Sequence, residues 1–136
     1  MSHDAMRTVF VRRIAFDKYE TSEALARSIE LIKQMHCDRV MLFDSRGHSE
    51  PAHLDPEEAV RRASVMRVAV KAFRDAGIGV GINNLATVGM NFSPPRKHPL
   101  PFQNLVDFDG KLFTECFCPL DTGFQDHLAF QFGTWA

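Results

Sequence analysis

Short apolar runs alternate along the chain with longer segments in which apolar residues recur at helical spacing. Residues 8–16 are rich in β-branched and aromatic side chains, and this composition predicts a first strand. Residues 39–44 form a second apolar run that ends in a carboxylate, and residues 78–84 form a third. Each of these runs has the length of a strand and is too short for an ordinary helix.

Two amphipathic helices are predicted between these strands. In residues 22–36, apolar side chains recur every three to four positions from Leu25 to Ile32, so one face is suited to pack on a sheet. The second helix, residues 56–76, carries the stronger start signal. Asp55 is suited to the N-cap, and Glu58 stands where it would complete a capping box. Gly77 predicts the end of this helix, because glycine readily takes the left-handed conformation.

Strand, helix, strand, helix and strand in this order predict an α/β fold. Parallel neighbours need a crossover of about a dozen residues or more, and both helical segments provide it. We therefore expect a parallel three-stranded sheet in sequence order, with both helices on one face. Residues 1–136 are interpreted as a single, partial domain, because such a sheet leaves an open edge that natural proteins usually cover.

After residue 84 the alternation stops. Residues 85–104 contain four prolines and predict an irregular excursion. Residues 105–114 predict a β-hairpin around a two-residue Asp109-Gly110 turn. A further helix is expected to start at Asp121, and the phenylalanine-rich end of the chain is expected to cover an apolar surface.

Composition narrows the class of protein. The net charge is −1, with 16 basic and 17 acidic residues, so no electrostatic footprint for nucleic acid or a membrane surface is present. No run approaches the roughly 20 apolar residues of a membrane span. The basic pairs Arg12-Arg13 and Arg61-Arg62 are interpreted as solvated faces. Three cysteines are too few for a disulfide framework, which favours a cytoplasmic location.

Candidate chemistry lies where the second and third strands end, because parallel α/β proteins bind ligands at the carboxyl ends of their strands. Asp44 and His48 follow the second strand, and Asn83-Asn84 end the third. A carboxylate and amides suit a polyol ligand, since they donate and accept hydrogen bonds. The alternative role of Asp44 is to cap its own loop, and the alternative for His48 is that of an ordinary loop residue. Alternation along a strand directs one asparagine toward a ligand and the other away.

Other signals of chemistry are weak. Cys116-x-Cys118 lacks a second pair, and His127 alone would not complete a zinc site, so no metal is expected. Gly79-x-Gly81 lies inside a strand, so it is not a dinucleotide-binding loop, and no cofactor is predicted. The catalytic residues of any reaction are unknown from the sequence.

Several segments together resemble a known family. They are Val40-Met41-Leu42-Phe43-Asp44, Ala76-Gly77-Ile78 leading into the run from Ile82-Asn83-Asn84 to Thr87-Val88-Gly89, Leu105-Val106-Asp107-Phe108-Asp109-Gly110, and Cys118-Pro119-Leu120-Asp121. This set resembles the N-terminal part of bacterial glycosidase-like TIM-barrel proteins. Met90 stands where the family has a histidine.

The resemblance implies that the chain is the opening portion of a TIM barrel, a parallel βαβαβ half-barrel with the hairpin as an excursion. The function it implies is that of a glycoside hydrolase-like fragment that supplies one side of a carbohydrate-binding cleft. Glycoside hydrolysis usually needs two carboxylates, and the resemblance implies that they lie on later strands, so the chain alone is expected to be inactive. The alternative is a small α/β ligand-binding module that self-associates through its open sheet edge.

Overall fold

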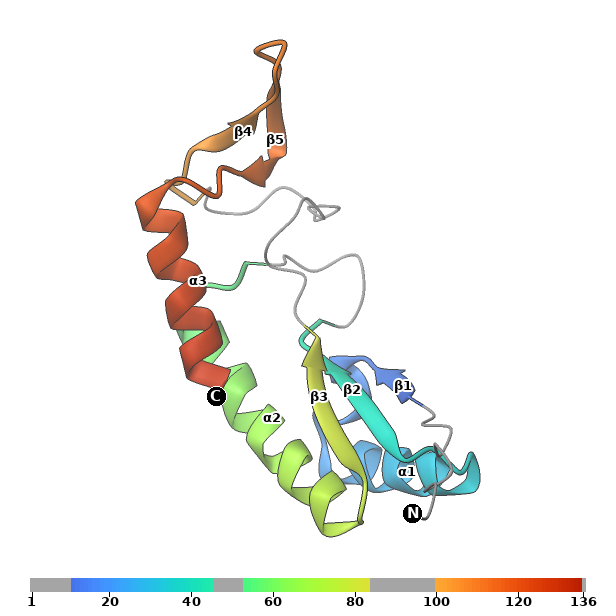
Figure 1. Cartoon of the computed structure of the whole chain (residues 1–136). Helices are drawn as coiled ribbons and strands as arrows, with labels where there is room; N and C mark the ends of the chain where they lie inside the picture. The colour runs from blue at the N-terminus through green and yellow to red at the C-terminus, as the bar shows by residue number, and fades with distance from the viewer. Residues whose placement is uncertain (1–10, 46–52, 84–99, 136) are drawn as a thin grey trace, which may run out of the picture.

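The structure is a computed structural model, and it describes residues 11–45, 53–83 and 100–135. Five strands and three α-helices, with one short 3-10 helix, occur in these ranges (Figure 1). The elements are β1 (Val11–Ile14), η1 (Phe16–Lys18), α1 (Ser22–Gln34), β2 (Arg39–Phe43), α2 (Pro56–Asp75), β3 (Gly79–Asn83), β4 (Asn104–Val106), β5 (Leu112–Phe117) and α3 (Thr122–Trp135).

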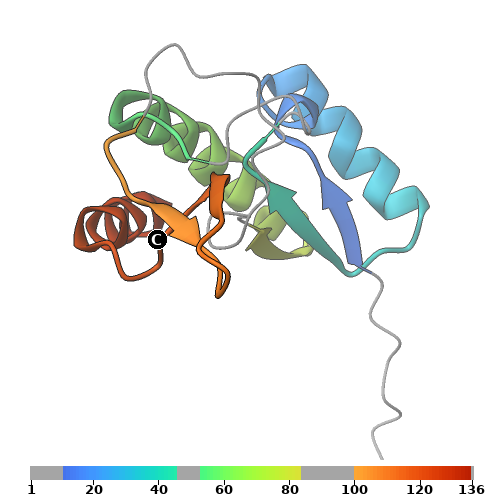
Figure 2. The same ribbon diagram turned by 90° about the horizontal axis from the view of Figure 1, so that it is seen from above.

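The predicted parallel sheet is confirmed. β2 lies between β1 and β3, and both pairings are parallel, in the order of the sequence. The first strand is shorter than expected, since Phe16 belongs to η1, and residues 8–10 lie outside the described ranges. Figures 1 and 2 place α1 and α2 against one side of this sheet.

The register explains why one face of the sheet carries the core. Ile14, Leu42 and Ile82 are neighbours across the three strands, and side chains on successive residues point to opposite faces. Ile14 and Leu42 are buried together with Ile32 of α1 and Phe73 of α2. Burial of such side chains stabilises a fold by roughly 1.5–3 kcal/mol each, so this layer holds both helices to the sheet.

The two long helices start differently from each other. Thr21 caps α1, and its hydroxyl oxygen accepts a hydrogen bond from the Ala24 amide at 3.1 Å. The prediction of a capping box at the start of α2 is wrong. Asp55 occupies the N-cap without a side-chain hydrogen bond to the helix, and Pro56 follows it. Glu58 is instead engaged by two arginines of the same helix, which remove it from the capping role.

Both helices end in the same hydrogen-bond arrangement. At α2, the Gly77 amide donates to Arg74 and the Ile78 amide donates to Phe73, and Gly77 has a φ of 79°. At α1 the equivalent left-handed position is held by His36, with a φ of 53°. This is a Schellman ending, and a histidine in it is strained, because the Cβ atom disfavours left-handed backbone.

The hairpin is confirmed, but its turn is longer than predicted. The Asp107 amide donates to the Lys111 carbonyl, so three residues lie between them. The Gly110 amide donates to the Asp107 carbonyl, and Gly110 has a φ of 80°. The Asp107 side chain accepts hydrogen bonds from the amides of Asp109 and Lys111, and these bonds favour the three-residue turn with a left-handed glycine.

Five rings join the hairpin and α3 to the segment before α2. His53 lies 5.1 Å from Phe124 and 5.2 Å from Phe117 between ring centroids, and Phe102 and His127 complete the cluster. The predicted start of α3 is confirmed, since Asp121 accepts a hydrogen bond from the Phe124 amide. Hydrogen bonds from the amides of Gln103 and Phe124 lower the pKa of Asp121. No described helix is long and apolar enough to cross a bilayer.

The strained ending of α1 gives a stability prediction. His36→Gly should raise the free energy of unfolding by about 0.5–1 kcal/mol, because relief of left-handed strain outweighs the added chain entropy of glycine. Gly77→Ala is the matched opposite and should lower it by about 1 kcal/mol. Urea unfolding of both variants measures the effect. A His36→Gly protein less stable than the original would contradict this interpretation of the helix ending.

Candidate functional site

Two of the four predicted site residues lie at the ends of neighbouring strands. Phe43 at the end of β2 is the register partner of Asn83 in β3, and Asp44 follows Phe43 directly. Asp44 is buried, with 3% of its surface exposed, whereas Asn83 is half-buried. His48 and Asn84 lie outside the described residues.

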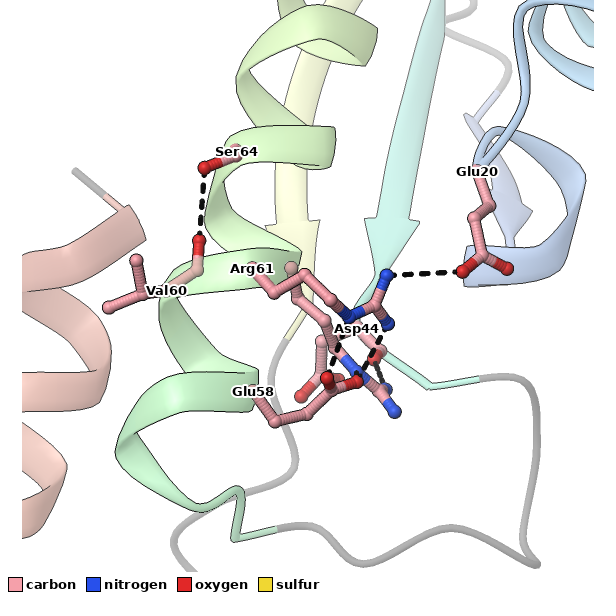
Figure 3. Close-up of polar contacts among 7 residues, drawn as sticks. Glu20, Asp44, Glu58, Val60, Arg61 and Ser64 are labelled. Carbon is pink, nitrogen blue, oxygen red and sulfur yellow. Dashed lines mark hydrogen bonds and ion pairs between the residues drawn. The ribbon is translucent and has the colours of Figure 1, made fainter.

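A buried arginine fixes the main chain at Asp44. The Arg62 side chain is 5% exposed, and its Nη1 donates a hydrogen bond to the Asp44 carbonyl oxygen. Its Nε donates to Glu58 at 2.6 Å. The interpretation of Arg61-Arg62 as a solvated face is therefore wrong for Arg62, which is buried and contacts the main chain just after β2. Figure 3 shows the neighbouring Arg61 between the carboxylates of Glu58 and Glu20.

Glu58 is the acidic centre of this group. Arg61 contacts it through Nε at 2.7 Å and Nη2 at 2.8 Å, a two-pronged arrangement, and also reaches Glu20 at 3.2 Å. Hydrogen bonds from Arg61, and then from Arg62, hold the pKa of Glu58 at about 2, although burial opposes this shift. A carboxylate with so low a pKa stays ionised near neutral pH, so Glu58 cannot serve as a general acid.

Tyr19 approaches the same strand end from the segment before α1. Its hydroxyl donates to the Phe43 carbonyl at 2.5 Å, and the side chain is buried. Burial raises the pKa of Tyr19, and the nearby charge of Asp44 adds to the rise. The Phe16 amide also donates to the Ser45 carbonyl at 3.2 Å. Three successive carbonyl groups, from Phe43 to Ser45, are thus held by different parts of the chain.

The sheet face opposite the helices carries the side chain of Asn83. The register places Arg13, Phe43 and Asn83 on that face. The Arg13 guanidinium lies 3.8 Å from the centroid of the Phe43 ring, a cation–π contact. Phe43 itself is buried, with 4% of its surface exposed, so the groups on this face that can hydrogen-bond a ligand are the half-buried Asn83 amide and the exposed Arg13 guanidinium. These are the features that a sugar ring or another polyol uses.

Sequence reasoning found the ends of the strands but missed the residues that support them. Arg62 and Tyr19 were not among the candidates, and neither was His53 of the ring cluster. One signal was available: Arg62 lies three residues after Ala59 and one before Ala63, and both alanines belong to the buried face of α2. The described residues contain no group of three or more histidine, cysteine or acidic side chains that could hold a metal ion.

Comparisons with known proteins return no relative. No protein-family model, no curated protein and no solved structure matches this chain. Functional inference therefore rests on the residues and their geometry, together with the motif resemblance described above.

The low pKa of Glu58 gives a pH prediction. A carboxylate with a lowered pKa stabilises the fold fully above its unfolded value of 4.5, and this contribution is lost as the pH falls toward 2. The difference in stability between the protein and Glu58→Gln should therefore be large at pH 6 and shrink steadily below pH of about 4.5. Urea unfolding midpoints at several pH values measure it.

Glu57→Gln is the matched control, because Glu57 lies in the same helical turn and is exposed. It removes the same charge but should leave the urea midpoint nearly unchanged at pH 6. A Glu57→Gln effect as large as that of Glu58→Gln would mean that helix-end charge, and not the arginine pairing, carries the stabilisation.

Proposed function

We propose that this chain forms the opening strands and helices of a (β/α)8 barrel and supplies one wall of a carbohydrate- or polyol-binding cleft. The observation that carries the proposal is the placement of Asp44 and Asn83 at the carboxyl ends of adjacent parallel strands. Barrel enzymes build their sites at that end from residues that follow several strands.

The strand order supports a barrel over the other common parallel architecture. A doubly wound sheet reverses its order near the first strand and carries helices on both faces. Here the order is β1, β2, β3, and α1 and α2 share one face (Figure 2). That arrangement repeats the unit of a barrel wall, whose inner face would carry Arg13, Phe43 and Asn83.

The role proposed for the chain is binding and not catalysis. Glycoside hydrolysis needs an acid and a second carboxylate across the scissile bond. Glu58 is committed to Arg61 and Arg62, and Asp44 is buried beside Tyr19 and Arg62. Within the described residues, neither carboxylate is placed as an acid facing a partner across an open cleft.

The second candidate function is a small self-associating ligand-binding module. The specific observation in its favour is an open groove beside each outer strand of the sheet. One groove is lined by β1 and α1, and the other by β3 and α2. Outer strands with such grooves present backbone groups that a further strand can pair with.

Binding by Asn83 is testable by titration. We expect a subset of a panel of mono- and oligosaccharides to shift the side-chain amide resonances of Asn83 in the nitrogen-15 labelled protein. Asn83→Ala should weaken that binding about tenfold, because loss of one or two net hydrogen bonds costs roughly 1–2 kcal/mol. Asn104→Ala, at the start of the hairpin, is the control and should bind as the original does. An equal loss of saccharide affinity in both variants would mean that the ligand does not bind at Asn83.

A separate prediction is that this chain alone has no glycosidase activity. The purified chain should not hydrolyse a panel of aryl glycosides above the uncatalysed rate, because the proposed wall lacks the second carboxylate. Release of the chromogenic phenol measures the rate. Robust turnover that Asp44→Asn abolishes would overturn the assignment of the chain to binding alone.

A further inference from the structure

The β4–β5 hairpin exposes an apolar tip that nothing in the described chain covers. Phe108 at the tip is fully exposed, and Val106 and Leu112 at its base are each about half exposed. Asp107 and Asp109 flank the phenyl group, so the tip is an aromatic side chain between two carboxylates. The hydrogen bonds of the Asp107 side chain hold this turn in one conformation, which lowers the entropy that a partner must remove on binding.

A groove of complementary character lies beside the outer strand β3. Its volume is about 430 Å³, and it lies between α2, β3 and the end of α3. Val70, Val80, Ile82 and Trp135 supply apolar surface to it. The space accommodates a phenylalanine side chain with its neighbouring residues.

Basic side chains line the same groove. Arg67, Lys71 and Arg74 face it along α2, against the single carboxylate of Asp75. Lys71 is paired with Asp75 at 2.6 Å, and Arg67 donates to the Thr134 carbonyl at 2.8 Å. The groove therefore combines an apolar surface with a positive border, the reverse of the acidic hairpin tip, and such complementarity directs association and its register.

The two outer strands of the sheet differ in how well they are protected against pairing with a further strand. β1 carries Arg12 and Arg13, and charges on an outer strand are a common device against strand pairing. β3 has the sequence Gly-Val-Gly-Ile-Asn and carries no charge. The β3 side is thus the less protected one, and it is the side on which this groove lies.

The hairpin of a chain cannot reach the groove of the same chain. The hairpin joins the start of α3, whereas Trp135 at the other end of α3 lines the groove (Figure 1). α3 has 14 residues, so at about 1.5 Å per residue its two ends are roughly 20 Å apart. A hairpin that docks in this groove therefore comes from another molecule.

We propose that the hairpin tip of one copy of this chain docks into the β3–α2 groove of a second copy. Phe108 enters the apolar part of the groove, and Asp107 and Asp109 lie beside Arg67 and Arg74. The contact joins two different surfaces, so each pair keeps one unused hairpin and one unused groove. Association of this kind continues into chains or closes into a ring. The inference is independent of polyol binding, which uses the opposite face of the sheet, where Asn83 lies.

Light scattering and sedimentation over a range of concentrations test the proposal. The original protein should grow beyond two copies of 15.4 kDa, and added salt should weaken this growth. Phe108→Ser and Arg74→Glu should each weaken association by about tenfold or more, as expected for central interface residues. Leu120→Ser is the control, because Leu120 is an exposed apolar residue after the hairpin, and it should associate as the original does.

Mixing of the variants distinguishes this contact from a symmetric one. Phe108→Ser keeps an intact groove, and Arg74→Glu keeps an intact hairpin. Together they should form a dimer and stop there, since the remaining hairpin and groove are both defective. Asp109→Arg combined with Arg74→Glu in one chain should restore growth. A protein that is monomeric throughout, a Leu120→Ser effect equal to that of Phe108→Ser, or failure of the mixture to form dimers would overturn the proposal.

Discussion

The carboxyl end of the sheet depends on one buried guanidinium. Moving a charged side chain out of water costs several kcal/mol unless partners replace the lost hydration. Arg62 satisfies this requirement with the Glu58 carboxylate and the Asp44 carbonyl. Glu58 must therefore remain ionised, and Arg61 helps by donating two further hydrogen bonds to it. The first turn of α2 and the end of β2 are joined through this charge, although 18 residues separate Asp44 from Arg62.

This constraint determines what the strand end can offer to a ligand. Because Arg62, Tyr19 and the Phe16 amide hold three successive carbonyls, the main chain at Asp44 has little freedom to adapt. A preorganised strand end loses less entropy when a ligand binds. The same contacts bury Asp44, so Asn83 on the neighbouring strand is the more accessible of the two polar groups. In the proposed cleft, the buried Asp44 holds the end of the strand in place, and Asn83 contacts the ligand.

The sequence predicts the sheet and its helices well, because periodicity and turn residues are local signals. The parallel order, both long helices, the hairpin and the start of α3 follow from such signals. The predictions that were wrong concern side chains whose environment is not visible in the local sequence. Glu58 fits a capping box locally, but the Arg61 and Arg62 guanidinium groups compete for it. Arg62 resembles a surface residue until its partner Asp44, just after β2, is known. His36 in the left-handed position shows the same limit, since no glycine marks it.

Two glycines of β3 shape the sheet face that carries Asn83. They lie on the sheet face opposite the helices, and a Cβ atom on Gly81 would fall 2.5 Å from the Met41 sulfur. A Cβ on Gly79 would lie 3.0 Å from the Arg39 side chain. The side chains of β2 therefore lean across β3, and Asn83 is the first residue of β3 on this face to carry a side chain of its own. The Met41 side chain occupies the place that Gly81 leaves beside Asn83, so a ligand held by the Asn83 amide in the proposed cleft would also lie against this thioether.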